Sequence, residues 1–190
     1  RCDPIVFDCG LADSQGTNNL VSEDFESYSN GVFSATGWVN YTEEGTESYQ
    51  VFSDSDNSPS MGNGLSIDSY QSGDTNTIAW LILPMVDFDA QEGETFNFKT
   101  SNSFSDDSTL KLLFSSDWDG DTATINNATW GELNSATIVQ DDDFYQDVID
   151  SGVVDLSCIE GTGYIAFKYI GSGDSGADGT YEIDDISLDY

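Results

Sequence analysis

The sequence predicts an all-β fold, an antiparallel β-sandwich of the jelly-roll type. Short apolar or alternating runs recur along the 190 residues, and clusters of Gly, Asn, Asp and Ser separate them. Asp, Asn, Ser and Thr side chains disfavour helices because they compete for backbone hydrogen bonds. Aromatic residues make up 13% of the chain and β-branched residues are frequent, which indicates a packed β domain rather than a disordered chain.

Several expected strands alternate apolar and polar residues, as half-buried antiparallel strands do. Phe96 and Phe98 share one face, and Leu110, Leu112 and Phe114 repeat the pattern. Many short strands of this kind in one domain are typical of a jelly roll. The expected strands are residues 20–27, 49–53, 64–69, 77–83, 94–101, 108–115, 136–140, 163–170 and 180–189.

The segment TIAWLILP at residues 77–84 is apolar at both parities. A strand with apolar residues on both faces is expected at the centre of a sheet, where both faces are covered. Pro84 has no amide hydrogen to donate, so we expect strand pairing to end there.

The last expected strand contains an irregularity at the range 184–185. Before it, Tyr181 and Ile183 share one parity, whereas Ile186 and Leu188 after it share the other. Both pairs face the core only if the strand gains one residue, which predicts a β-bulge. The re-aimed residues are then Asp184 and Asp185, whose mutual repulsion favours a cation between them.

A second group of carboxylates lies in the first expected strand, VSEDFES. The first and last strands of a jelly roll commonly lie side by side, so the two groups are expected to meet. A hard cation with six to eight oxygen ligands holds such a cluster together, and the sequence therefore predicts structural Ca²⁺. The alternative is a solvated acidic edge. The expected metal ligands are Glu23, Asp24, Glu26, Asp184 and Asp185.

Two further acidic runs are better explained as loops. Asp117, Asp119 and Asp121 alternate before and after Gly120, as in calcium loops, but the closing bidentate Glu of such a loop is missing. An ordinary Asp/Gly turn is the better interpretation. The run 141–143 consists of three Asp residues, and a solvated loop explains it best.

The charge of the chain excludes several classes of function. It carries 36 acidic and 4 basic residues, a formal net charge of −32, and no histidine. Such a chain repels phosphate and anionic headgroups, which excludes nucleic acids and acidic membranes as partners. Mechanisms that need histidine are removed as well, and the small size of the chain argues against a carboxylate enzyme. We expect no enzyme.

The length corresponds to one domain with a short N-terminal extension. Residues 1–19 end in a polar stretch without periodicity, so we expect a linker there and a jelly-roll binding module at residues 20–190. No initiator Met, signal-like segment or membrane-spanning apolar run is present. The chain is expected to be a monomeric piece of a longer exported protein, not inserted in a membrane.

Three cysteines are present in this acidic chain, whose composition suits a salty extracellular medium. We expect Cys2 and Cys9 to close a short loop around Pro4, with Cys158 as a small buried residue. A bridge between Cys9 and Cys158, or no bridge, are the alternatives, because spacing does not determine connectivity.

Aromatic residues in polar segments are the candidates for ligand binding. Sugars stack on aromatic faces while Asp, Asn, Gln or Lys groups bond their hydroxyls. The alternative for each aromatic residue is a place in the core. The leading candidates are Trp38, Tyr41, Trp118 and Tyr145, and Trp80 and Trp130 follow them.

Several motifs recur in the same order in known families: EDFES, GW at 37–38, AWLILP, LKLLFSSDWDG, NATWGEL, YIAFKYIG and YEIDDISL. Because these motifs follow one another in this order, the chain resembles the choice-of-anchor J and cleaved-adhesin families of Bacteroidetes surface proteins over roughly residues 20–190. The resemblance implies a jelly roll related to galactose-binding-like domains, often with calcium near the joined terminal strands. It also implies attachment or ligand binding at the outer bacterial surface, and no established catalytic residues.

Together, the loop aromatics and the resemblance predict a non-catalytic carbohydrate-binding module of a secreted or surface-tethered glycan-uptake protein. A neutral polysaccharide is favoured because the acidic chain repels sulfated and uronic polymers. A β-1,3-glucan such as laminarin is the leading candidate ligand. The alternative is an adhesion or spacer module that contacts protein partners without a glycan site.

Overall fold

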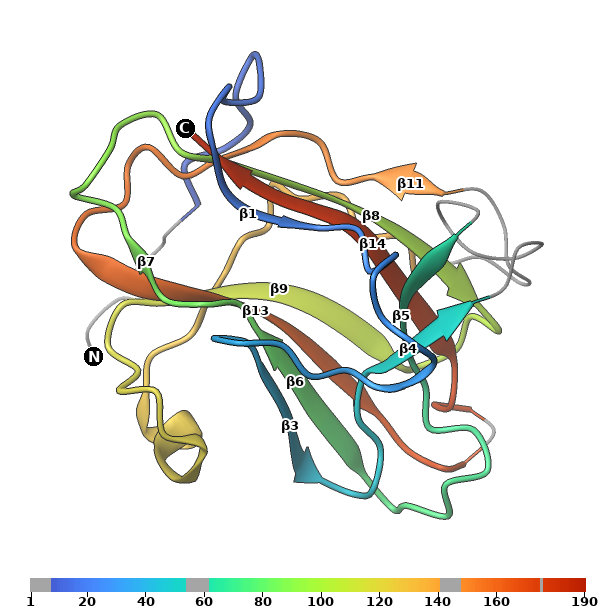
Figure 1. Cartoon of the computed structure of the whole chain (residues 1–190). Helices are drawn as coiled ribbons and strands as arrows, with labels where there is room; N and C mark the ends of the chain where they lie inside the picture. Colours follow the sequence, from blue (N-terminus) through green and yellow to red (C-terminus); the bar gives the residue numbers. More distant parts are fainter. Residues whose placement is uncertain (1–7, 54–61, 141–147, 175) are drawn as a thin grey trace.

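The computed structural model describes residues 8–53, 62–140, 148–174 and 176–190. In these ranges the protein is all-β, and two antiparallel sheets face each other as the layers of a jelly-roll sandwich (Figure 1). The one helical segment in this part of the chain is the short 3₁₀ helix η1, Thr122–Asn127. The predicted fold class is confirmed.

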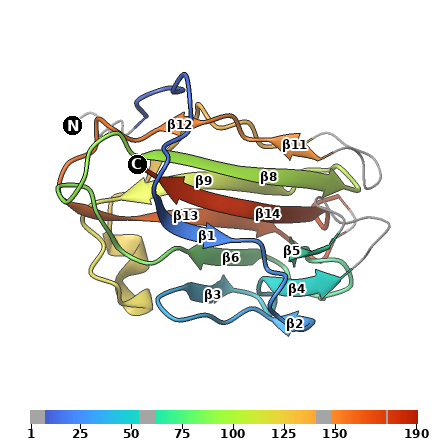
Figure 2. The same cartoon turned by 45° about the horizontal axis from the view of Figure 1, so that its top comes forward.

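The first sheet is formed around the last strand, β14. Its main order is β11 (Ile149–Asp150), β8 (Thr95–Ser103), β14 (Thr180–Asp189), β5 (Asn63–Ile67), β4 (Gln50–Ser53) and β2 (Gly31–Val32). Two strands join it outside this order, β1 (Asn19–Glu23) on β14 and β12 (Val154–Asp155) on β8. Figure 2 shows the two sheets as stacked layers.

The second sheet lies beneath the first in Figure 1. Its order is β10 (Gly131–Glu132), β9 (Thr109–Ser115), β13 (Thr162–Gly171), β6 (Thr77–Ile82) and β3 (Val39–Glu44). The short strand β7 (Val86–Asp87) pairs with the beginning of β13.

The main core fills the space between the sheets. Phe96 and Phe98 of β8 point into it, as do Leu110, Leu112 and Phe114 of β9, so the predicted alternation is confirmed. Aromatic rings join the two layers across this core through edge-to-face contacts, which add to the stabilisation from buried apolar area.

The prediction for residues 77–84 is also confirmed. β6 pairs with β13 on one side and with β3 on the other, and the strand ends at Ile82, before Pro84. Leu81 faces the main core, whereas Trp80 packs in a second apolar cluster on the opposite face of the sheet. Both faces of the strand are therefore covered.

Two strand predictions differ from the structure. Residues 136–140 form no strand, because Thr137 bonds Ser151 through its backbone while Val139 donates to a side-chain hydroxyl of β8. The strand β3 was not expected, since its polar residues obscure the alternation. Each of the other expected segments overlaps one longer strand, and the two-residue strands were not expected either. The overlapped strands are β1, β4, β5, β6, β8, β9, β13 and β14.

The β-bulge in the last strand is confirmed. The register of β14 against β8 shifts between Asp184 and Ser187, and Asp185 has a positive φ of 47°. Ile183 and Ile186 are consequently both buried in the main core. The first and last strands are neighbours, as predicted, with Glu23 opposite Ile186.

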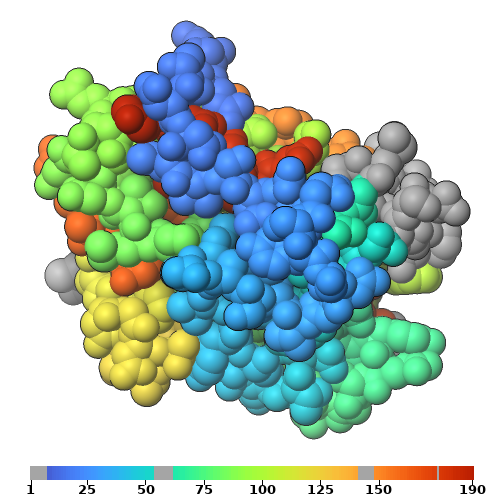
Figure 3. Space-filling view, viewed as in Figure 1, coloured from blue at the N-terminus to red at the C-terminus, as the bar shows by residue number. Residues whose placement is uncertain are grey.

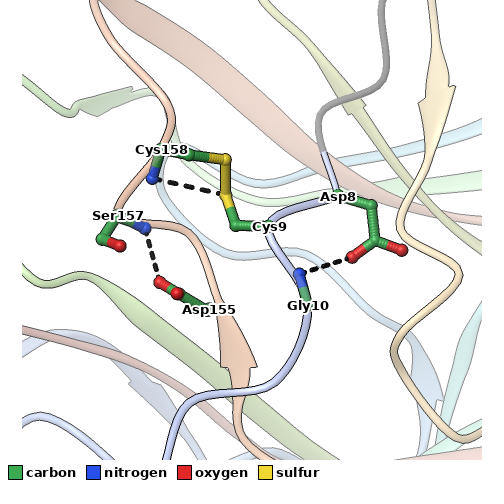
Figure 4. Close-up of a disulfide and its surroundings, with 6 residues drawn as sticks. All are labelled: Asp8, Cys9, Gly10, Asp155, Ser157 and Cys158. Carbon is green, nitrogen blue, oxygen red and sulfur yellow. Dashed lines mark hydrogen bonds between the residues drawn. A yellow bond between two sulfur atoms is a disulfide. The ribbon is translucent and has the colours of Figure 1, made fainter.

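The expected disulfide is corrected. Cys9 is bonded to Cys158, 149 residues away in sequence, with their Cα atoms 5.8 Å apart (Figure 4). The pairing arises because residues 10–12 run along β12: the backbone amide of Ala12 donates to Val153, and Asp155 donates to Gly10. Cys2 lies outside the described residues. The described part of the segment before β1 is thus fastened to the sandwich.

Candidate functional site

Four of the six aromatic candidates gather on one face of the molecule. Tyr41, Trp80, Trp118 and Trp130 belong to one apolar cluster on the outer side of the second sheet, which we call the outer aromatic face. Strand pairing sets Tyr41 opposite Trp80. On the other side of Trp80 stands Lys168, the neighbour of Lys111 on β9, so a row of aromatic and cationic residues crosses the sheet.

The indole rings of this face are largely enclosed. Trp80 is 1% exposed and Trp118 is 5% exposed, because η1 and its flanking residues cover the sheet. Figure 3 shows η1, in yellow, against the β3 region, in blue. The ring centroid of Trp130 lies 5.0 Å from that of Trp80 and 5.8 Å from that of Trp118. The cluster is therefore a second small core.

All three indole nitrogens on this face donate hydrogen bonds within the protein. Nε1 of Trp80 donates to Oε2 of Glu43 at 2.7 Å, and the other indoles donate to backbone carbonyls of Asp121 and Ile125. Their polar atoms are thus already satisfied. The expectation that Trp80 and Trp118 present their faces to a sugar is corrected by their burial, whereas Tyr41 and Trp130 stay half-buried at the surface.

Lys168 is held over the Trp80 ring, with Nζ 4.3 Å from the ring centroid and 3.9 Å from Oε2 of Glu43. Burial lowers the pKa of Lys168; Glu43 acts in the opposite direction, and the charge of Lys111 adds to the lowering. The desolvated ammonium is compensated by an acidic partner and an aromatic face, which is a structural arrangement.

The remaining two aromatic candidates lie elsewhere. Trp38 packs against the main core, with its ring 5.5 Å from that of Phe33 in an edge-to-face contact. It is half-buried and belongs to a different face from Tyr41. Tyr145 lies outside the described residues.

The structure instead places exposed aromatic rings at one end of the sandwich, on the right in Figure 1. The loops that follow β5 and β8 and the loop that precedes β14 meet there around a pocket of 580 Å³, which we call the loop groove. Tyr70 is 63% exposed and Phe104 is 52% exposed. The groove is lined by Asp68, Tyr70, Phe104, Ser105, Asp106, Asp178 and Thr180.

Hydrogen bonds fix the walls of the loop groove. Asp106 accepts from the backbone amides of Ser108 at 2.7 Å and Gly179 at 2.9 Å, which joins the β8–β9 loop to the residues before β14. Asp68 accepts from the amide of Tyr70 at 3.0 Å. These bonds hold the aromatic residues on preformed turns, so little chain entropy remains to be lost on binding.

The backbone at Phe104 is strained. Its φ is 58°, in the left-handed region that bulky side chains rarely adopt. Such conformations cost of order 1–3 kcal/mol and occur preferentially at functional sites. Here the strain sets an aromatic ring at the surface, where it covers none of the main core.

The loop groove is acidic. Among the described residues that line it, three are Asp and none is Lys or Arg. Burial raises the pKa of Asp68, and the charges of Glu47 and Asp178 raise it further, although the amide of Tyr70 opposes this. The groove offers hydrogen-bond acceptors beside two exposed rings and repels anions.

Sequence reasoning did not select Tyr70 or Phe104. Phe104 directly follows β8 and Tyr70 comes three residues after the end of β5, and each stands beside Ser and Asp residues, in DSY at 68–70 and FSDD at 104–107. An aromatic residue in such a polar turn lies outside the apolar pattern of the strands, and that was the available signal.

The five predicted metal ligands do not form one group. Glu23 accepts from the amide of Phe25 and the hydroxyl of Tyr28, whereas Asp185 is paired with Lys99. Across the part of the chain that the structure describes, no three acidic, cysteine or histidine side chains stand close enough to hold a metal ion. The other three predicted ligands are divided between the residues that follow β1, Asp24 and Glu26, and the last strand, which contains Asp184.

The acidic loop at 117–121 is an ordinary turn, as favoured from the sequence. Asp121 caps η1 by accepting from the amide of Ala123, and Asp117 accepts from the amide of Thr129 at 2.7 Å. Hydrogen bonds from Thr124 and from the amide of Asp121 lower the pKa of Asp119. The run 141–143 lies outside the described residues.

Comparison with solved structures agrees with this architecture. The K1 cleaved adhesin domain of Lys-gingipain from Porphyromonas gingivalis W83 has a TM-score of 0.56 at 17% identity, over 88% of this chain and 96% of that domain. The K3 domain of the same protein has a TM-score of 0.53 at 18% identity, over 90% and 99%. TmCBM61, solved with β-1,4-galactotriose, has a TM-score of 0.54 at 16% identity, over 90% and 97%.

The molecule is thus a jelly-roll domain with an aromatic, acidic groove at one end. The chain belongs to the DUF5017 family, described as a domain of unknown function, whose family profile matches residues 87–188. No curated protein has a significant match to the sequence. No helix in the described ranges is long and apolar enough to cross a membrane.

Proposed function

We propose that this chain is a non-catalytic carbohydrate-binding module that binds a neutral polysaccharide in the loop groove. The observation that carries the proposal is the pair of exposed rings, Tyr70 and Phe104, beside the acceptors Asp68, Asp106 and Asp178. Sugar rings present C–H faces that stack on aromatic rings, and their hydroxyls donate to carboxylates. A pocket of 580 Å³ is within the size of ligand sites.

The charge of the groove selects among glycans. The charged residues that line the described groove are all Asp, on a chain with a net charge of −32, so a sulfated or uronic polymer is repelled there. Neutral polymers avoid this repulsion. A β-1,3-glucan such as laminarin is the first polymer to test, and the likeness to TmCBM61 adds β-1,4-galactan.

We place the module on the outer surface of a bacterium, as part of a longer exported protein resembling the choice-of-anchor J group. The disulfide between Cys9 and Cys158 suits an oxidising, extracellular compartment. The likeness to adhesin domains of Porphyromonas gingivalis supports the same location.

The likeness to cleaved adhesin domains also supports a second candidate function, an adhesion or spacer module that contacts proteins. In that case the exposed rings of Tyr70 and Phe104 contact a protein partner. The two functions differ in whether any free polysaccharide binds, so one panel of glycans distinguishes them.

The proposed function is tested by affinity electrophoresis of the full chain against laminarin, mannan, xylan, β-1,4-galactan, alginate and carrageenan. At least one neutral polymer is expected to retard the chain, and the anionic ones are not. Tyr70→Ala and Phe104→Ala should each weaken binding about tenfold through lost stacking. Tyr190→Ala is the matched control, since this residue is 38% exposed and does not line the groove.

Three outcomes contradict the proposal. Retardation by alginate or carrageenan alone overturns the charge argument, and no retardation by any polymer favours the adhesion or spacer function. Binding that survives both Tyr70→Ala and Phe104→Ala but is lost in Trp130→Ala or Tyr41→Ala moves the site to the outer aromatic face.

We also propose the structural calcium ion between the first and last strands. The carboxylate of Glu26 accepts from the amide of Asn63, and Asp184 is fully buried beside the same segment, with Oδ2 3.6 Å from the Cβ position of Gly64. Asp24 accepts from the amide of Glu26. Two of the predicted ligands, Glu26 and Asp184, thus lie along one short stretch of chain, which supports a site centred on them.

A further inference from the structure

A second polar pocket lies at the end of the sandwich opposite to the loop groove. It has a volume of 490 Å³ and is formed by the β7–β8 loop and the residues between β12 and β13, on the left in Figures 1 and 2. Its carboxylates are Asp89, Glu92, Glu94 and Glu160. We call it the acidic end pocket.

Hydrogen bonds hold the two walls of this pocket together. The amide of Phe88 donates to the carbonyl of Gly161 at 2.8 Å, and the amide of Gly161 donates to Oδ1 of Asp89 at 2.8 Å. At the other side the amide of Leu156 donates to the carbonyl of Glu94 at 2.9 Å. The pocket is therefore a preformed feature of the fold and not a gap between independent loops.

Glu94 is the unusual residue of the pocket. Glu94 is one of the residues that line the pocket, although it is only 2% exposed, and among the described residues its buried Oε1 has no hydrogen-bond partner. A buried polar atom without a partner costs of order 1–3 kcal/mol, and more when the group is charged. Glu94 therefore lowers the stability of the fold at a position where a buried apolar residue would carry no such penalty.

No cation of the protein compensates Glu94 in the described chain. The three lysines are paired elsewhere, with Asp185, Glu132 and Glu43. The remaining acidic residues of the pocket add further negative charge. Within the part of the chain that the structure describes, no basic side chain supplies a compensating charge to Glu94, which favours a cation from solution.

We infer that the acidic end pocket binds a divalent cation, Ca²⁺, with Glu94 as its buried ligand and Asp89, Glu92 and Glu160 around it. Calcium takes six to eight oxygen ligands in flexible geometry, and this pocket offers carboxylates and room for water. Zinc prefers nitrogen or sulfur ligands, which the lining residues lack, and magnesium demands a tighter octahedral site.

No three acidic, cysteine or histidine side chains of the described residues stand close enough together to hold a metal ion, so binding requires side chains of this pocket to move inward. Glu92 and Glu160 are both exposed and lie at the rim, so they are able to turn inward over a bound cation. Glu94 and Asp89, held by the walls, form the fixed part of the site.

The experiment is calcium titration calorimetry on the full chain after removal of metal with EDTA, with magnesium as a parallel titrant. Glu94→Gln keeps the shape of the side chain and removes its charge. Wild type is expected to bind one calcium equivalent more than Glu94→Gln, or to bind that equivalent at least tenfold more tightly. Glu44→Gln, an exposed residue of β3, is the matched control and should bind as wild type does.

Asp184→Asn separates this site from the calcium site proposed at the terminal strands, because it should leave the Glu94-dependent equivalent in place. Melting curves provide the second measurement: calcium is expected to raise the melting temperature of wild type more than that of Glu94→Gln. Identical calcium stoichiometry and affinity in wild type and Glu94→Gln would overturn the inference. The absence of any calcium binding by wild type would overturn it too.

Discussion

Nζ of Lys99 lies 2.7 Å from Oδ2 of Asp185, at the bulge of the last strand. Their hydrogen bond and opposite charges raise the pKa of Lys99, against the effect of its partial burial. The chain thus supplies its own cation to one of the two carboxylates re-aimed by the bulge. The charge of Asp184 also raises the pKa of Lys99, and Asp184 is fully buried. We expect calcium dependence to involve Asp184 because of this burial.

The first prediction concerns this calcium site. At a calcium concentration of about a hundred times Kd, binding stabilises the fold by about 2.7 kcal/mol, which corresponds to a rise in Tm of about 5–11 °C. Melting curves with calcium and with EDTA measure it. Asp184→Asn should lose the part of the rise that this site contributes, whereas Asp185→Asn should keep it. Superimposable curves for wild type, after checking that no ion persists through purification, would exclude both calcium sites.

The second prediction concerns the small core of the outer aromatic face. Glu43 accepts from Nε1 of Trp80 at 2.7 Å and from Nδ2 of Asn126 at 2.7 Å. Glu43→Ala leaves the buried indole N–H without an acceptor and is expected to destabilise the fold by about 1–3 kcal/mol, or about 2–12 °C in Tm. Glu44→Ala, at the exposed neighbouring position, should change Tm little. Equal effects of the two substitutions would contradict the role of Glu43.

The third prediction concerns the disulfide. The bond between Cys9 and Cys158 closes a loop of 149 residues, so its removal enlarges the unfolded ensemble. Cys9→Ser is expected to lower the free energy of unfolding by about 2–5 kcal/mol. Denaturant unfolding with and without a reductant measures this. Cys2→Ser should leave the transition unchanged, and a wild-type transition insensitive to reductant would argue against a stabilising bridge.

The fourth prediction concerns pH and Asp68 in the loop groove. Burial and the neighbouring acidic charges raise its pKa in the folded state above the ordinary value of 3.8. The folded protein is therefore penalised at pH values above the raised pKa and relieved as the pH falls below 3.8. Asp68→Asn should raise Tm at neutral pH, and the gain should vanish near about pH 3.

The control for Asp68→Asn is Asp13→Asn, an exposed residue outside the groove, whose Tm should match wild type at both pH values. The same Asp68→Asn protein is informative for glycan binding, because a loss of affinity in a protein of higher Tm is not caused by unfolding. A lower Tm for Asp68→Asn at neutral pH would show that the carboxylate stabilises the groove instead.

The local pattern of apolar and polar residues was sufficient to predict the long strands and the bulge. Side-chain direction alternates along a strand, so the change of parity around Asp184 and Asp185 already implied an extra residue. The burial of both faces of β6 followed from its apolar residues at both parities, because each face must contact another layer. These features depend on residues a few positions apart.

Contacts between distant parts of the chain could not be predicted from the sequence. The pairing of residues 10–12 with β12 decided which cysteine Cys9 meets, and the position of η1 over the second sheet decided that Trp118 is buried. The same holds for the loop groove, since Tyr70 and Phe104 follow different strands and meet only where those strands end together.

By itself, then, the sequence determined the all-β class, the strand faces and the acidic character of the chain. Composition and period-two alternation carry that information, because each depends on short-range chemistry. Only the tertiary structure decided which aromatic rings stay exposed and that Glu94 is buried without a partner. Exposure and hydrogen-bond satisfaction are properties of the packed layers around a residue, and no single segment contains them.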